Sequence, residues 1–96
     1  MDEQKSFDYY TKAAEKGNKI AMNNLAFSYF NGKGVEADSN MAIHWFIKSG
    51  EKGNYISYKY AGYIYENGFG VDVDFDKAIR YYILASEHNV VPAFQR

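Results

Sequence analysis

The chain has 96 residues, of which 47% are apolar and 19% aromatic, and its formal net charge is −1. Its length suits one domain, and its near-neutral charge argues against a nucleic-acid binder, which would carry a basic patch or stripe. No stretch approaches the roughly 18 uninterrupted apolar residues of a membrane span, and the first residues lack the basic and apolar regions of a signal peptide. The sequence contains no cysteine, so no disulfide framework forms. The absence of cysteine is compatible with any cellular compartment.

The first helical pattern lies in residues 1–18, and it recurs later in the chain. Tyr9-Tyr10 matches Trp45-Phe46, and Lys16-Gly17-Asn18 matches Lys52-Gly53-Asn54, each 36 residues further on. A fixed period of this length is the signature of a repeat architecture. The pattern therefore divides the chain into a half repeat, two full repeats and the start of a further first helix, over residues 1–18, 19–54, 55–90 and 91–96.

The first full repeat is predicted to contain two helices. Helical spacing of Ala21, Leu25 and Tyr29 predicts one over Lys19–Asn31, with Gly32 as a left-handed C-terminal cap. The second is expected over Ser39–Lys52, with Asp38 accepting hydrogen bonds from the first free backbone N–H groups. We expect Gly53 to end this helix, and its buried stripe to consist of Ala42, Ile43, Phe46, Ser49 and Gly50.

The second repeat carries the same signals, including a second glycine loop. Asn31-Gly32-Lys33-Gly34-Val35 becomes Asn67-Gly68-Phe69-Gly70-Val71, and Asp38 becomes Asp74. A loop that cradles phosphate would follow a strand and open a helix. This loop follows a helix, lacks a third glycine and has Phe69 where Lys33 stood, so we interpret it as an interhelical turn capped by Gly68.

These motifs resemble the Sel1-like repeat, a relative of the tetratricopeptide repeat. The resemblance covers essentially the whole chain, with mild departures such as Ala26 at the helix crossing. It implies an all-α solenoid of antiparallel helix pairs that serves as a scaffold for protein–protein contacts. Starting at Asp2 and stopping inside a helix further suggests a piece of a longer array. The matching segments include Leu25–Tyr29, Gly32–Val35, Ala42–Phe46, Glu51–Gly53, Asp74–Ala78 and Tyr9–Gly17.

Motifs for chemistry are weak, so we expect no enzyme activity, metal or cofactor. Asp72–Lys77 resembles the start of a calcium loop but has Lys77 where that loop needs glycine. His44 and His88 occupy positions that carry charged residues in the other repeats, so both should be exposed. No serine lies in a nucleophile-elbow motif.

The aromatic residues suggest a binding surface. By the resemblance, one face of each first helix lines a concave groove, and Phe27, Phe30 and Tyr63 are its aromatic members. Aromatic anchors beside amides and charges are typical of an interface hot spot. The alternatives are ordinary surface aromatics on a structural spacer that self-associates through uncapped ends, or a carbohydrate or cell-wall binder. The expected partner-binding residues are Asn23, Phe27, Phe30, Asn31, Lys59, Tyr63, Glu66 and Asn67.

Overall fold

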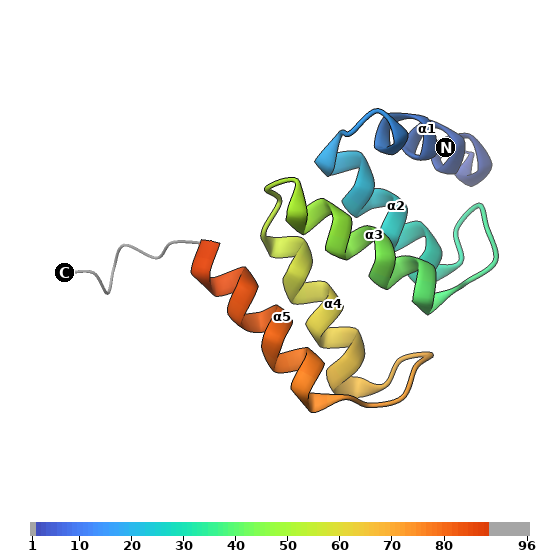
Figure 1. Cartoon of the computed structure of the whole chain (residues 1–96). Helices are drawn as coiled ribbons and strands as arrows, with labels where there is room; N and C mark the ends of the chain where they lie inside the picture. The colour runs from blue at the N-terminus through green and yellow to red at the C-terminus, as the bar shows by residue number, and fades with distance from the viewer. Residues whose placement is uncertain (1, 89–96) are drawn as a thin grey trace.

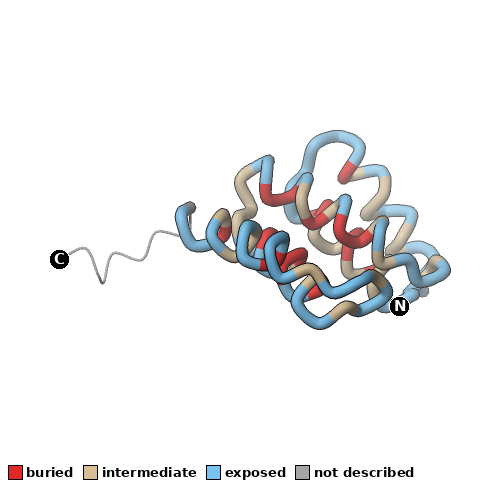
Figure 2. Tube along the Cα trace, turned by 60° about the horizontal axis from the view of Figure 1, so that its bottom comes forward, coloured by how far each residue is buried: buried red, intermediate tan, exposed pale blue. Residues whose placement is uncertain are grey.

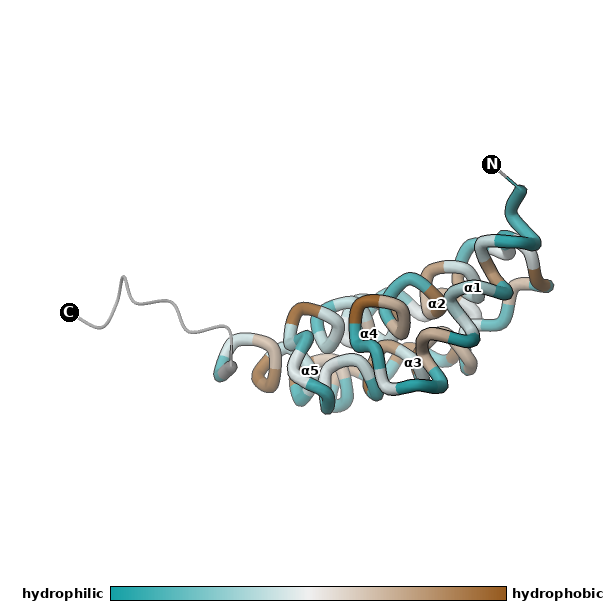
Figure 3. The backbone as a smooth tube through the Cα atoms, turned by 90° about the horizontal axis from the view of Figure 1, so that it is seen from above, coloured by the Kyte–Doolittle hydropathy of each residue, from teal (hydrophilic) through white to brown (hydrophobic). Residues whose placement is uncertain are grey.

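The computed structural model describes residues 2–88, which form five α-helices and no strand. Each helix packs chiefly against its neighbours in the chain, so the helices follow one another in a row from α1 to α5 (Figures 1 and 3). This arrangement is the all-α solenoid that the repeat pattern predicts. The helices are α1 (Glu3–Glu15), α2 (Lys19–Asn31), α3 (Ser39–Glu51), α4 (Ile56–Asn67) and α5 (Phe75–His88).

The second helix of each pair, α1, α3 and α5, begins after an aspartate. The carboxylates of Asp2, Asp38 and Asp74 accept hydrogen bonds from the backbone N–H groups of Gln4, Met41 and Lys77 at 2.9, 3.1 and 3.0 Å. Each bond satisfies one of the N–H groups that a helix start leaves free.

The two first helices begin differently. Asn18 caps α2 by accepting from the Ala21 N–H at 3.0 Å. Its equivalent, Asn54, instead uses its backbone carbonyl to accept from Ser57, and α4 starts at Ile56 without a side-chain cap. Helix α4 therefore begins one residue later in its repeat than α2 does.

The two glycines of each loop have separate roles. Gly32 and Gly68 end α2 and α4 at φ values of 70° and 67°, which favour glycine. Gly34 and Gly70 instead touch the preceding second helix. A Cβ on Gly34 would lie 2.9 Å from Phe7 Cβ, and one on Gly70 would lie 2.8 Å from Ser39 Cβ. The loop thus turns the chain and also packs one repeat against the previous one.

The core runs along the middle of the row, where each helix meets the next (Figure 2). The whole stripe predicted for the second helix, from Ala42 to Gly50, is buried on α3. On α2, Ala21, Leu25 and Ala26 are buried and Tyr29 is half-buried. Helical periodicity therefore identifies the face of each helix that meets its neighbours.

An aromatic groove between the first helices

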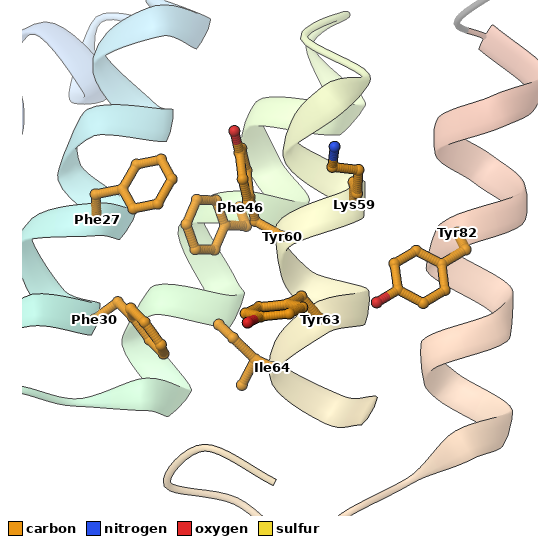
Figure 4. A pocket seen from close by; sticks show the side chains of 8 residues that line it. All are labelled: Phe27, Phe30, Phe46, Lys59, Tyr60, Tyr63, Ile64 and Tyr82. Atoms are coloured by element: carbon orange, nitrogen blue, oxygen red, sulfur yellow. The ribbon is translucent and has the colours of Figure 1, made fainter. Parts of the chain in front are cut away.

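The candidate site is a groove of about 370 Å³ that crosses the two repeats (Figure 4). Its walls come mainly from the first helices α2 and α4, and α3 and α5 each add one ring. All of its lining side chains except that of Lys59 are aromatic or aliphatic. They are Phe27, Phe30, Phe46, Lys59, Tyr60, Tyr63, Ile64 and Tyr82.

Helical spacing brings these side chains to one surface. Phe27 and Phe30 are three residues apart on α2, and Lys59 and Tyr63 are four apart on α4, so each pair shares a helix face. The parallel placement of the two first helices then sets both pairs on opposite sides of the same hollow.

Edge-to-face ring contacts hold the α2 side of the groove in place. The Phe27 ring centroid lies 4.9 Å from that of Phe46 and 4.8 Å from that of Tyr60, with steep interplanar angles. Phe46 is only 1% exposed, so Phe27 rests directly on the core. Such aromatic pairs contribute about 0.5–1.5 kcal/mol beyond the area they bury. This wall of the groove is therefore preformed.

Among the rings that line the groove, Tyr63 is the most accessible, with 50% of its surface exposed. Phe69, from the second glycine loop, packs against both Tyr63 and Phe30 with centroid distances of 5.5 and 6.0 Å. The residue that replaces Lys33 in the second repeat therefore supports two of the rings that line the groove.

The polar groups at the rim are one hydrogen-bonded pair and one cation. Tyr82 Oη donates to Glu66 Oε1 at 2.5 Å. Desolvation, and then this bond to a carboxylate, raises the pKa of Tyr82 to about 12. Lys59 is exposed and forms no ion pair with any residue of the described chain. The groove is thus an apolar hollow whose rim carries one positive charge, on Lys59, and one negative charge, on Glu66.

Four of the eight residues expected on this surface line the groove: Phe27, Phe30, Lys59 and Tyr63. Glu66 stands at the rim through its bond to Tyr82. The amide of Asn67 donates back to the Tyr63 carbonyl at 3.0 Å, and Asn31 is exposed outside the lining.

Asn23 has a packing role in the structure. Its Oδ1 lies 2.7 Å from Ser57 Oγ, which in turn lies 2.8 Å from Ser49 Oγ. Ser49 donates to the Lys19 carbonyl at 2.7 Å. This chain of hydrogen bonds joins α2, α3 and α4, so Asn23 is committed to the contact between repeats.

Sequence reasoning missed four of the lining residues. Phe46 was expected only in the buried stripe of the second helix, Tyr82 is its equivalent in the second repeat, and Tyr60 and Ile64 carried no signal of their own. The available signal was the aromatic pair at 46 and 82, because a large ring at a helix contact can reach through to the groove on the other side.

The remaining candidates lie elsewhere. The capping residues Gly32, Asp38, Gly53, Gly68 and Asp74 all sit at helix ends, and Gly53 has a φ of 110°. Asp72–Lys77 contributes the Asp74 cap, and the side chains that the structure describes include no cluster of three or more metal-ligating groups.

The two histidines were both expected to be exposed. His44 is exposed, and its ring contacts Trp45 at a centroid distance of 5.1 Å. The side chain of His88 falls outside the described part of the structure. Among the described residues, no helix is both long enough and apolar enough to cross a bilayer.

A solenoid of short antiparallel helix pairs, with a glycine turn inside each pair, is the architecture of helical repeat proteins. The Sel1 repeat family model matches residues 2–18, 19–54 and 57–90, so the chain belongs to the Sel1 repeat family. A search of curated proteins gives no match.

Two solved structures show the same fold. A Sel1 repeat protein from Oxalobacter formigenes is 30% identical with a TM-score of 0.77, and the match covers 88% of this chain and 35% of that one. The protective antigen c5321 of uropathogenic Escherichia coli is 31% identical with a TM-score of 0.80, over 90% of this chain and 18% of that one. The chain therefore spans about a third and a fifth of these two relatives.

Proposed function

We propose that the chain is a non-catalytic scaffold whose groove binds an extended or helical segment of a partner protein. The observation that carries this proposal is the aromatic groove, which has a preformed wall, a half-exposed ring at Tyr63 and room for a large side chain. Sel1 repeat proteins generally serve as interaction scaffolds, which supports the same assignment.

The lining defines the chemistry of the segment. Seven of the eight lining side chains are aromatic or aliphatic, so the anchor is a bulky apolar side chain such as Phe, Trp or Leu. Burying such an anchor among rings contributes about 1.5–3 kcal/mol. The charge of Lys59 favours an acidic side chain, or a terminal carboxylate, next to the anchor. An acidic group beside the anchor mainly increases specificity and the association rate, and it adds less to the affinity.

The test is selection from a displayed library of random decapeptides, followed by titration of the selected peptides. We expect selected peptides to combine one bulky apolar residue with a nearby Asp or Glu. Tyr63→Ala should weaken their binding at least severalfold, because the half-exposed ring contributes to the anchor site and little to the core. Phe27 is a poor choice for substitution, since its ring rests on Phe46.

The matched control is Tyr9→Ala, which removes a ring that is 67% exposed on α1, away from the groove. Lys59→Glu should reverse the preference for acidic peptides, whereas Lys48→Glu, on the exposed face of α3, should leave it unchanged. Selected peptides that bind Tyr63→Ala as tightly as the unaltered chain would refute the assignment of the groove.

A further inference from the structure

A second hollow, which is polar, lies one repeat before the aromatic groove. It has a volume of about 290 Å³ and is bounded by α1, α2 and the first glycine loop. Tyr10 and Ser28 in its lining are the 36-residue equivalents of the groove residues Phe46 and Ile64. This polar hollow therefore has the place in its repeat that the groove has in the next one. Its lining is Glu3, Ser6, Tyr10, Ser28 and Lys33.

Three equivalent positions differ in polarity between the polar hollow and the groove. At each of them, the polar hollow has a hydroxyl or an amine, whereas the residue that lines or supports the groove has a hydrocarbon side chain. Hydroxyl and amine groups form hydrogen bonds with a ligand, which hydrocarbon side chains cannot do. The two hollows therefore suit different side chains. The three pairs are Tyr10 and Phe46, Ser28 and Ile64, and Lys33 and Phe69.

The hydroxyl groups of the polar hollow have no partner within the described chain. Ser28 is only 7% exposed, yet its hydroxyl forms no hydrogen bond with any described residue, and those of Ser6 and Tyr10 form none either. Buried polar groups in native proteins nearly always have a hydrogen-bond partner. The partner of the Ser28 hydroxyl therefore enters the hollow from outside the described chain.

The charges around the polar hollow cancel. Lys33 Nζ lies 4.0 Å from Glu3 Oε2, and both side chains are about 60% exposed. A charged ligand would meet one attractive and one repulsive group there, so the ion pair gives no preference for either sign of charge. A neutral amide both donates and accepts hydrogen bonds, as the three hydroxyl groups do. The lining therefore suits the side chain of Asn or Gln.

Helix α2 contributes to both hollows, so one bound segment can reach both. Phe27 and Phe30 of this helix line the groove, and Ser28 lines the polar hollow. Packed helices lie about 8–10 Å apart, and an extended chain rises about 3.3 Å per residue, so about three residues of a segment cross α2. The start of a further first helix, expected over residues 91–96, lies outside the described part of the structure.

We propose that the partner segment carries an Asn or Gln about three residues from its apolar anchor, and that this amide binds in the polar hollow. The inference rests on the proposed function, because the same segment places its anchor in the aromatic groove. The amide hydrogen-bonds to the Ser28 hydroxyl and to those of Ser6 and Tyr10 beside it. The anchor supplies most of the affinity, and the amide fixes the register of the segment along the row.

The test is a titration with anchored decapeptides from the groove selection, in which the residue three positions from the anchor is Gln, Leu or Ala. The Gln peptide should bind severalfold more tightly than the other two. Ser28→Ala should remove this preference, because the buried hydroxyl is lost, and Ser28→Thr should keep it. Ser28→Ile, which installs the side chain of Ile64, should reverse the preference in favour of Leu. The matched control is Ser86→Ala, at an exposed serine of α5, which should change nothing.

Tyr63→Ala separates this inference from the assignment of the groove. It should weaken all three peptides by the same factor and leave the preference for Gln intact, because it removes part of the anchor site alone. If Tyr63→Ala weakens binding but the unaltered chain does not prefer Gln, or the preference survives Ser28→Ala, the polar hollow holds only water. The inference is then wrong, and the groove assignment stands. If no peptide binds through Tyr63, both are wrong. Circular dichroism melts check that each variant folds.

Discussion

Helices α3 and α5 occupy the same position in successive repeats, yet only α3 has a described helix packed on each side. Ile43 on α3 is 6% exposed, and its equivalent on α5, Ile79, is 55% exposed. By contrast, Ala42 and its equivalent Ala78 are both almost fully buried, at 0% and 2%. The difference lies on one side of the helix, the side that faces the next repeat.

The comparison separates two contributions to burial. The face carrying Ala78 meets its own first helix, since a Cβ on Gly62 of α4 would lie 3.0 Å from the Ala78 carbonyl oxygen. The face carrying Ile79 has no described neighbour, and Figure 3 shows hydrophobic residues on α5 at this end of the row. The sequence of a repeat thus sets which residues are apolar, while the adjacent repeat determines which of them are buried.

The sharpest test substitutes the two equivalent isoleucines. Ile43→Ala should lower the free energy of unfolding by about 2–5 kcal/mol, because it leaves a cavity where α3 packs against its neighbouring helices. Ile79→Ala should change it by only about 0.5 kcal/mol, as at an ordinary surface position. Urea unfolding followed by circular dichroism measures both. Equal losses would mean that the α5 face is covered in solution.

The next prediction concerns the contact between α3 and α4, where the Tyr58 ring lies over Gly50. A Cβ added to Gly50 would come within 2.7 Å of ring atoms. Gly50→Ala should destabilise the chain by about 1–3 kcal/mol through overpacking, even though alanine is the better helix former. Tyr58→Met in the same chain should restore much of the loss, because Ala14 and Met22 already pack this way between α1 and α2. Urea midpoints of the two single variants and the double variant check it. A double variant less stable than Gly50→Ala alone would show that the α3–α4 contact cannot pack in the way that the α1–α2 contact does.

Features set by local sequence could be predicted in detail. The buried stripe from Ala42 to Gly50 follows from helical spacing. The bonds accepted by Asp38 and Asp74 follow from chemistry within three residues of each cap. Such features depend on a single helix and its period, which repetition makes visible.

Features that depend on contacts between repeats could not be predicted as well. The share of the groove contributed by Phe46 and Tyr82 depends on how far a ring reaches across a helix contact. The commitment of Asn23 to Ser57 depends on the partner helix. The period alone also cannot show that α4 and α2 start differently, because Asn54 uses its backbone where Asn18 uses its side chain.

The caps provide the opposite comparison, in which α3 and α5 should behave alike. Asp38→Ala and Asp74→Ala should each cost about 1 kcal/mol, because an N-cap acts within its own helix end and needs no neighbouring repeat. Asp→Asn at either site should cost much less, since the amide oxygen can still accept the bond. Chemical unfolding of the four variants checks this. If the cap contributes to stability only in α3, the first turn of α5 is frayed in solution.

The smallest expected effect is a pH dependence at Tyr82, which is equivalent to Phe46. The pKa of Tyr82 is raised from 10.0 to about 12, by desolvation first and by the hydrogen bond to Glu66 second. A raised pKa in the folded state means that the contribution of this hydroxyl to stability is complete below pH 10. It is then lost as the pH rises through about 12, because the unfolded chain releases its proton first. We therefore expect the melting temperature to fall over this range, and Tyr82→Phe to flatten part of the fall. Phe46 shows that a ring without a hydroxyl fits this position. Tyr9→Phe, on an exposed ring of α1, is the control and should leave the alkaline slope unchanged. Equal alkaline slopes for Tyr82→Phe and Tyr9→Phe would show that the hydrogen bond between Tyr82 and Glu66 contributes nothing to stability.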